Sequence, residues 1–133
     1  MNCLNCHKKM IEQSADTRRG QVDYDVCEAC GSIWFDMGEL DAMVPQVFES
    51  VETASRDAAA GISEPPPRRC PRCEPQLLDK VFFLRYSDIL LDHCSNCHGF
   101  WLDGGELDRI NEELRGIKAA KDHGPVVHFV VRL

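Results

Sequence analysis

Basic side chains are outnumbered by acidic ones in this sequence, and aromatic residues and long apolar runs are few. Its 133 residues include 15 lysines and arginines against 22 aspartates and glutamates, and aromatic residues make up 8%. Because nucleic-acid affinity depends mainly on basic groups that neutralise phosphates, this balance opposes non-specific nucleic-acid binding. No apolar run approaches the roughly 20 residues of a transmembrane helix, so we expect no membrane span.

We also expect no signal peptide, because Cys3 and Cys6 follow Met1 almost at once. We therefore expect a cytoplasmic protein, in which disulfides are rare. No cysteine is left over from the pattern C-x2-C-x20-C-x2-C, which occurs twice. The first set is Cys3, Cys6, Cys27 and Cys30, and the second is Cys70, Cys73, Cys94 and Cys97.

The two cysteine sets belong to an internal repeat with a shift of 67 positions. Residues 27–41 read CEACGSIWFDMGELD, and residues 94–108 read CSNCHGFWLDGGELD. The same shift relates the cysteine pairs at 3/6 and 70/73, with no insertion between the copies. A repeat of this kind indicates one structural unit used twice.

The cysteine spacing is typical of tetrathiolate zinc sites. Each C-x2-C pair forms a tight turn, a zinc knuckle, which aims two sulfurs at one point, and zinc accepts tetrahedral sulfur ligation. We therefore predict two Zn²⁺ ions, one for each set of four, with an iron–sulfur cluster or disulfides as the alternatives. A unit of about 45 residues has little core, so zinc would supply much of its folding free energy.

The pattern predicts a small, metal-stabilised α+β protein made of two tandem zinc ribbons. Each ribbon is a β-hairpin between two knuckles, followed by a helix. The alternation of apolar and polar residues at 22–26 predicts the return strand of the first hairpin. We expect the first ribbon at 1–44, a helix and Pro-rich linker at 45–69, the second ribbon with its helix at 70–118, and a β-prone tail at 119–133.

Each second knuckle is followed by a tryptophan and an acidic motif, D-x-G-E-L-D. The tryptophans are expected to pack beneath the zinc knuckles. An aspartate followed three residues later by a glutamate predicts an N-cap and its capping-box partner at a helix start. These residues are Trp34, Asp36 and Glu39 in the first ribbon and Trp101, Asp103 and Glu106 in the second.

Apolar spacing predicts a helix from Gly105 through Ile117, with Leu107, Ile110 and Leu114 on one face. In the first ribbon, Pro45 is expected to end one helix and begin another that runs to about Gly61.

Both ribbons resemble the transcription factor IIB-type zinc-ribbon family. The resemblance rests on C-x2-C, a hairpin, a second C-x2-C and then the Trp, Asp and Gly-Glu-Leu positions, and it covers residues 3–43 and 70–110. It implies zinc binding. Two departures from an even match are His98 where the first ribbon has Gly31, and Leu4-Asn5 where the second has Pro71-Arg72.

Three functions fit these observations. The leading hypothesis is a non-catalytic zinc-ribbon adaptor that binds a protein partner, because the sequence contains no nucleophile–base pair and no phosphate-binding loop. The alternatives are a zinc finger that binds nucleic acid or transcription machinery, and a zinc-thiolate sensor of redox state or metal. The apolar helix faces and tail also predict pairing of the two repeats and a homodimer.

Overall fold

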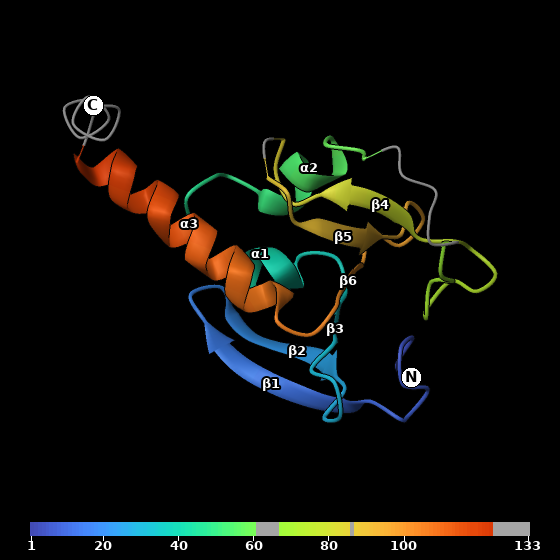
Figure 1. Ribbon diagram of the computed structural model, residues 1–133. Helices are drawn as coiled ribbons and strands as arrows, with labels where there is room; N and C mark the ends of the chain where they lie inside the picture. The colour runs from blue at the N-terminus through green and yellow to red at the C-terminus, as the bar shows by residue number, and fades with distance from the viewer. Residues whose placement is uncertain (61–66, 86, 124–133) are drawn as a thin grey trace.

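The computed structural model describes residues 1–60, 67–85 and 87–123 and shows six strands and three helices there (Figure 1). The strands form one antiparallel sheet in the order β1-β2-β3-β6-β5-β4. The elements in chain order are β1 Ile11–Thr17, β2 Gly20–Val26, β3 Ile33–Phe35, α1 Glu39–Met43, α2 Val51–Arg56, β4 Asp79–Phe82, β5 Leu90–His93, β6 Phe100–Leu102 and α3 Glu106–His123.

Each ribbon contributes one hairpin to the sheet, as the repeat predicts. The first hairpin pairs β1 with β2 in the register Ile11↔Val26 to Thr17↔Gly20. Gly20 has φ 99°, and the Thr17 hydroxyl donates to its carbonyl at 2.6 Å, so the hairpin turns at this point. The second hairpin, β4 with β5, is shorter and more deeply buried.

The two ribbons are joined through their central strands, β3 and β6. The register pairs Trp34 with Trp101, which are equivalent residues of the repeat, and pairs Ile33 with Leu102 and Phe35 with Phe100. A pseudo-twofold axis therefore passes through the tryptophan pair. The expected division of the chain places the two ribbons in separate units joined by a linker. The separation is wrong, because shared backbone hydrogen bonds make the two ribbons one sheet.

Side chains of the central strands alternate between two buried clusters. Phe35, Phe100 and Leu102 face an apolar core that also holds Ile110 and Leu114 of α3, all of them fully buried. Trp34 and Trp101 face the opposite side and pack among the cysteines. Because strand residues point alternately to the two faces, one three-residue strand serves both clusters.

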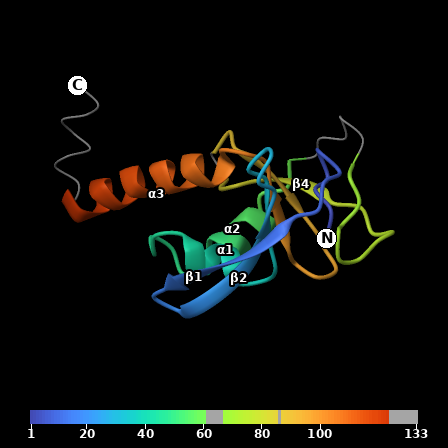
Figure 2. The same cartoon turned by 90° about the horizontal axis from the view of Figure 1, so that it is seen from below.

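The helices cover the core face of the sheet. α3 begins beside β6 and extends past α1 and α2, so that its last turns project beyond the strands (Figures 1 and 2). Lys121 near its end donates to the carbonyl of Val47 at 3.0 Å and lies 4.6 Å from the centre of the Phe48 ring. This contact fastens α3 to the loop that leads into α2.

Helices α1 and α2 cap each other with buried carboxylates. Glu52 of α2 accepts from the backbone N–H groups of Gly38 and Asp41 at the start of α1, at 2.9 and 3.0 Å. In return, Asp41 accepts from the N–H groups of Val51 and Glu52 and from the Ser50 hydroxyl. The expected start of this helix at Pro45 is therefore wrong: Ser50 is the N-cap, and α2 begins at Val51.

Two other boundaries bear on the expected division of the chain. α3 runs to His123, beyond the helix end expected at Ile117, so residues 119–123 are helical rather than part of a β-prone tail. Residues 61–66 of the Pro-rich linker and residues 124–133 of the tail lie outside the described residues, and so does the tail's expected strand. Within the described residues, no helix is both long enough and apolar enough to cross a membrane.

Candidate metal centres

The structure brings each predicted set of four cysteines together. In both sets the four sulfurs all lie within 4.8 Å of one another. The sulfurs of Cys3 and Cys30 are 3.6 Å apart, and those of Cys70 and Cys97 are 3.8 Å apart. A tetrahedral zinc with Zn–S bonds of about 2.3 Å separates its sulfurs by about 3.8 Å. The donors therefore fit zinc, and they are free cysteines rather than disulfides.

Tight backbone turns aim the sulfurs at each centre. The backbone amides of Asn5 and Cys6 both donate to the Cys3 sulfur at 3.4 Å. In the second ribbon, the amides of Arg72 and Cys73 donate to the Cys70 sulfur at 3.4 and 3.3 Å. Such N–H groups stabilise thiolate charge. The sequence therefore builds most of each centre locally, from the C-x2-C turn itself.

The residue after a knuckle adopts a left-handed backbone in three of the four turns. Its φ is 60° at His7, 78° at Gly31 and 61° at His98. Each of these residues donates its amide to the carbonyl of the first cysteine of its knuckle. The exchange of Gly31 for His98 between the repeats therefore keeps the turn, although a side chain makes this conformation less favourable.

The polar groups around the thiols shift their acidity. The Ser32 hydroxyl, 3.1 Å from the Cys30 sulfur, lowers the pKa of that thiol to about 6. Burial raises the pKa of Cys97 in the other set. Four thiolates at such close range repel one another, so a divalent cation is the natural partner for the set.

Both tryptophans are fully buried beneath the metal centres, as expected. The indole N–H of Trp34 donates to Asp36 at 2.9 Å, and that of Trp101 donates to Asp103 at 3.0 Å. Gly99, which follows the fourth knuckle, lies against the Trp34 ring so closely that a Cβ there would be 2.1 Å from a ring carbon. The first ribbon's tryptophan therefore supports the second ribbon's knuckle.

The N-cap role predicted for the motif aspartates is wrong in both ribbons, because α1 begins at Glu39 and α3 at Glu106, three residues after Asp36 and Asp103. The N-cap of α1 is Gly38, with no side-chain hydrogen bond, so the N-cap role for Asp36 is wrong. The Asp36 side chain instead accepts from Trp34 and from Arg72. Glu39 does bond back to the Asp36 amide at 2.8 Å, so that half of the capping box is confirmed.

The aspartates receive their other hydrogen bonds from the opposite ribbon. Asn5, inside the first knuckle, donates to Asp103 of the second ribbon at 2.7 Å. Arg72, at the equivalent position of the third knuckle, binds Asp36 of the first ribbon at 3.1 Å and Asp25 at 3.3 Å. Each ribbon's leading knuckle is thus tied to the other ribbon's acidic motif.

Arg68 adds further bonds to the contact between Asn5 and Asp103. It binds Asp103 at 3.3 Å, forms a salt bridge with the buried Asp92, and hydrogen-bonds the Asn5 side chain. Burial of Asp103 opposes its ionisation, but hydrogen bonds from Asn5, Trp101 and Arg68 outweigh burial and lower its pKa. Asp103 is therefore held as a carboxylate that joins both ribbons.

A backbone contact links the first metal centre to the second ribbon. A Cβ at Gly104 would lie 2.1 Å from the carbonyl oxygen of Cys30, a ligand of the first centre. Gly31 is the next residue, and its own Cβ would be 3.7 Å from the Gly104 Cα. The second knuckle therefore rests directly on the loop between β6 and α3.

Sequence reasoning found all eight cysteines but missed the residues that connect the ribbons. These are Asn5, Arg68, Arg72, Gly99 and Gly104. Asn5 and Arg72 differ in chemistry, yet the repeat shift places them at equivalent positions. Both copies have a polar residue at that position and an acidic motif after the second cysteine pair. This shared pattern is the signal that could have predicted the contacts between each knuckle and the acidic motif of the other ribbon.

The Asn5–Asp103 contact can be tested by a double-mutant cycle. Asp103→Ala should lower the free energy of unfolding by about 1–3 kcal/mol, because it removes charge-assisted hydrogen bonds and leaves the buried Trp101 indole N–H unpaired. Two zinc ions should still bind. Chemical denaturation of Asn5→Ala, Asp103→Ala and the double variant should show losses that do not add, with a coupling of roughly 0.5–3 kcal/mol. Strictly additive losses would mean that the contact does not connect the ribbons.

Glu106 predicts a pH effect on stability. Burial, followed by nearby Asp103, raises its pKa to about 8 from the ordinary 4.5, and one carboxyl oxygen is buried without a hydrogen-bond partner among the described residues. The folded state therefore holds the Glu106 carboxyl proton more tightly than the unfolded state does. The contribution of Glu106 to stability falls as the pH rises from about 4.5 to about 8.

Glu106→Gln should stabilise the protein at pH 8 by on the order of 1–2 kcal/mol, after solvent screening of this partly exposed group. The gain should shrink toward pH 5, where glutamate is protonated in the fold. Denaturation with excess zinc at several pH values measures it, and Glu112→Gln on the exposed side of α3 is the control. A gain that does not change with pH would contradict the assignment.

The comparisons with known proteins agree with the geometry of the second centre. Residues 69–113 match the family described as "Transcription factor zinc-finger", the transcription factor IIB-type zinc ribbon. This segment, with its four-cysteine site and hairpin, is therefore similar to the zinc ribbons of that family, and the first ribbon repeats its cysteine spacing. No curated protein and no solved structure matches the chain. The protein is thus a zinc-binding protein with two tetrathiolate sites.

Proposed function

We propose that this protein is a non-catalytic adaptor, a rigid zinc-stabilised module that binds another protein. The observation that carries the proposal is an apolar groove of about 360 Å³ on the helical side of a scaffold whose metal ligands are otherwise used for folding. Four sulfurs complete a tetrahedral shell, which gives zinc a structural role and leaves no position for substrate.

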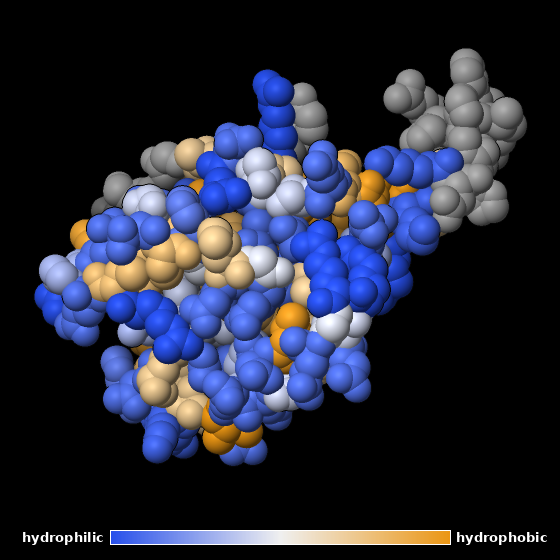
Figure 3. Space-filling view, turned by 180° about the vertical axis from the view of Figure 1, so that it is seen from behind, coloured by the Kyte–Doolittle hydropathy of each residue, from blue (hydrophilic) through white to orange (hydrophobic). Residues whose placement is uncertain are grey.

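The same fold and the same zinc sites would also suit a protein that binds nucleic acid. The charges of the structure favour a protein partner. Three arginines lie at the third knuckle and all are engaged by carboxylates: Arg68, Arg69 and Arg72. Figure 3 shows a rear face that is mostly hydrophilic, with several groups of apolar residues. The whole chain has a formal net charge of −7. Engaged arginines on an acidic protein offer little to phosphates.

Affinity capture on the zinc-loaded full chain tests the proposal. The cell extract is divided, one half is treated with nucleases, and both halves are washed with increasing salt. A protein partner should be retained equally from both halves. Capture that disappears after nuclease treatment, together with direct binding to nucleic acid that weakens steeply with salt, would replace the proposed function by nucleic-acid binding.

A further inference from the structure

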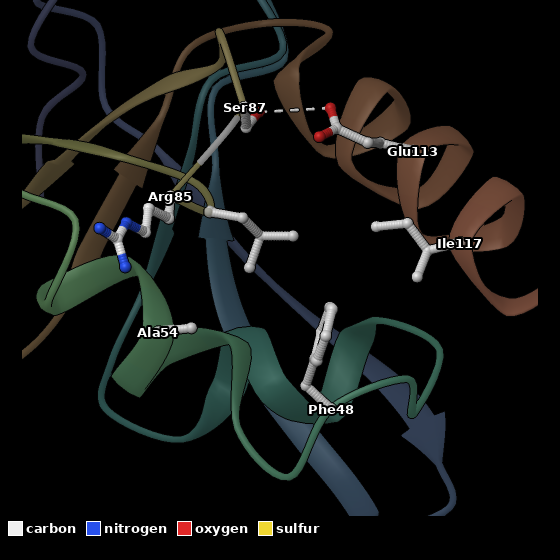
Figure 4. Close-up of a pocket in the computed structure, with 7 residues that line it drawn as sticks. Phe48, Ala54, Arg85, Ser87, Glu113 and Ile117 are labelled. Atoms are coloured by element: carbon white, nitrogen blue, oxygen red, sulfur yellow. Dashed lines mark hydrogen bonds between the residues drawn. The ribbon is translucent and has the colours of Figure 1, made fainter. Parts of the chain in front are cut away.

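The apolar groove lies between α2, the segment after β4 and the middle of α3 (Figure 4). Phe48 points into it from the loop before α2 and Ile117 from α3, and Ala54 of α2 lies at its edge. Leu84, Ser87 and Glu113 complete this part of the lining. The volume of about 360 Å³ is in the range of pockets that hold a ligand, roughly 300–1,000 Å³.

The groove is an apolar surface that the chain's own core leaves open. Phe48 and Leu84 pack against the main core only at its edge and remain partly exposed. Elsewhere in the described residues the large exposed apolar side chains are Ile11, Met37 and Leu77, which lie outside the groove lining. Burying a contiguous apolar surface of this kind against a partner lowers the free energy.

Carboxylates stand around the groove. Glu113 lies in its wall and accepts from the Ser87 hydroxyl at 3.3 Å. An adjoining hollow shares Phe48 and Ala54 with the groove and is bordered by the exposed residues Glu49 and Asp57. Arg85 and Lys121 also lie nearby, the latter over the Phe48 ring. Of these charged residues, the three carboxylates outnumber the two basic side chains, and this excess favours an apolar segment that carries basic groups.

We propose that this groove, lined by Phe48, Ala54, Leu84 and Ile117, binds a short partner segment whose apolar side chains adjoin lysine or arginine. The inference rests on the proposed function and specifies its partner. The apolar side chains enter between Phe48 and Ile117, and the basic groups face Glu49, Asp57 and Glu113. Apolar anchors would supply affinity, and the charges would fix the direction and the choice of segment.

The test is a selection from a random peptide library displayed on phage, with the zinc-loaded full chain as the target. The enriched peptides should share apolar residues next to lysine or arginine. Synthetic copies should bind Ile117→Asp at least tenfold more weakly, since a charge then occupies the apolar wall. Met37→Asp is the matched control, because it makes the same kind of change at a residue 62% exposed outside the groove. The Met37→Asp variant should bind the synthetic peptides with the same affinity as the original protein.

A charge-reversal pair tests the acidic border. The double variant Glu49→Lys, Asp57→Lys should weaken peptide binding at least threefold and change its salt dependence. Glu12→Lys, on exposed β1, should do neither. Each variant is first checked for two bound zinc ions, so that loss of folding is not mistaken for loss of binding.

Other results would overturn the inference. No enrichment, a consensus rich in aspartate and glutamate, or equal binding to Ile117→Asp would remove the groove as the site. If peptides are enriched only on a truncated chain that ends at His123, the groove is occupied by residues 124–133 of the chain itself. If the protein dimerises as its concentration rises and Ile117→Asp abolishes this, the groove is occupied by a second copy. A nuclease-resistant partner captured equally by Ile117→Asp would leave the adaptor function in place and reject only this surface.

Discussion

Replacing Cys30 by serine is expected to destabilise both metal centres, although only the first loses a ligand. Serine cannot supply the fourth thiolate, so the first centre loses most of its zinc-derived folding free energy, which is on the order of 10–16 kcal/mol in zinc-finger peptides. The effect should spread because β3 pairs with β6, and because the Cys30 carbonyl rests against Gly104 of the second ribbon.

The measurement is the rate at which a chelator removes zinc from the second centre, which retains all four cysteines. This rate should rise at least tenfold in Cys30→Ser, and Cys97→Ser should have the reciprocal effect on the first centre. Glu28→Ser, an exposed position inside the second knuckle, is the control. Unchanged release from the second centre would show that the ribbons are independent.

Gly104→Ala is expected to weaken the first metal centre from within the second ribbon. The added Cβ would lie 2.1 Å from the Cys30 carbonyl oxygen, so the loop or the knuckle must move. Overpacking of this kind costs about 1–3 kcal/mol, and more when the backbone resists. Zinc should therefore leave the first centre faster, even though the substitution changes no ligand and no charge.

Gly116→Ala is the matched control for this substitution. Gly116 lies inside α3, and a Cβ there would meet nothing within 4 Å. The change should stabilise the helix by up to about 1 kcal/mol and leave zinc release from the first centre unaltered. Equal unfolding free energies and zinc release rates for the two alanine variants would contradict the contact between Gly104 and Cys30.

The sequence predicted the local parts of this structure well. The cysteine spacing predicts each set of four, because the ligands come from short turns whose geometry depends on neighbouring residues. The apolar spacing of Ile110 and Leu114 also predicts α3. These features depend on periodicity and turn chemistry, which a single sequence displays directly.

The relation between the ribbons could not be predicted in the same way. Nothing local in Ile33–Phe35 tells that this strand pairs with its own copy 67 positions away, since a three-residue apolar strand suits many neighbours. The motif aspartates show the same limit. Asp36 has the spacing of an N-cap, but the tertiary contacts with Trp34 and Arg72 take its side chain instead.

The expected homodimer stays a prediction. It was inferred from apolar helix faces that need cover, and the shared sheet now provides much of that cover within one chain: Val51, Ile110 and Leu114 are all buried. The expected protein partner also stays a prediction, which now has a defined surface to test.

If two zinc ions hold one merged structure, the two ions should bind cooperatively. Native mass spectrometry during the addition of zinc to the metal-free protein tests it most directly. Because the ribbons share a sheet and exchange polar contacts, the account predicts that metal-free and two-zinc species dominate at half saturation, with little one-zinc protein. A one-zinc species that dominates there, or a chain that binds a single ion at saturation, would contradict the account.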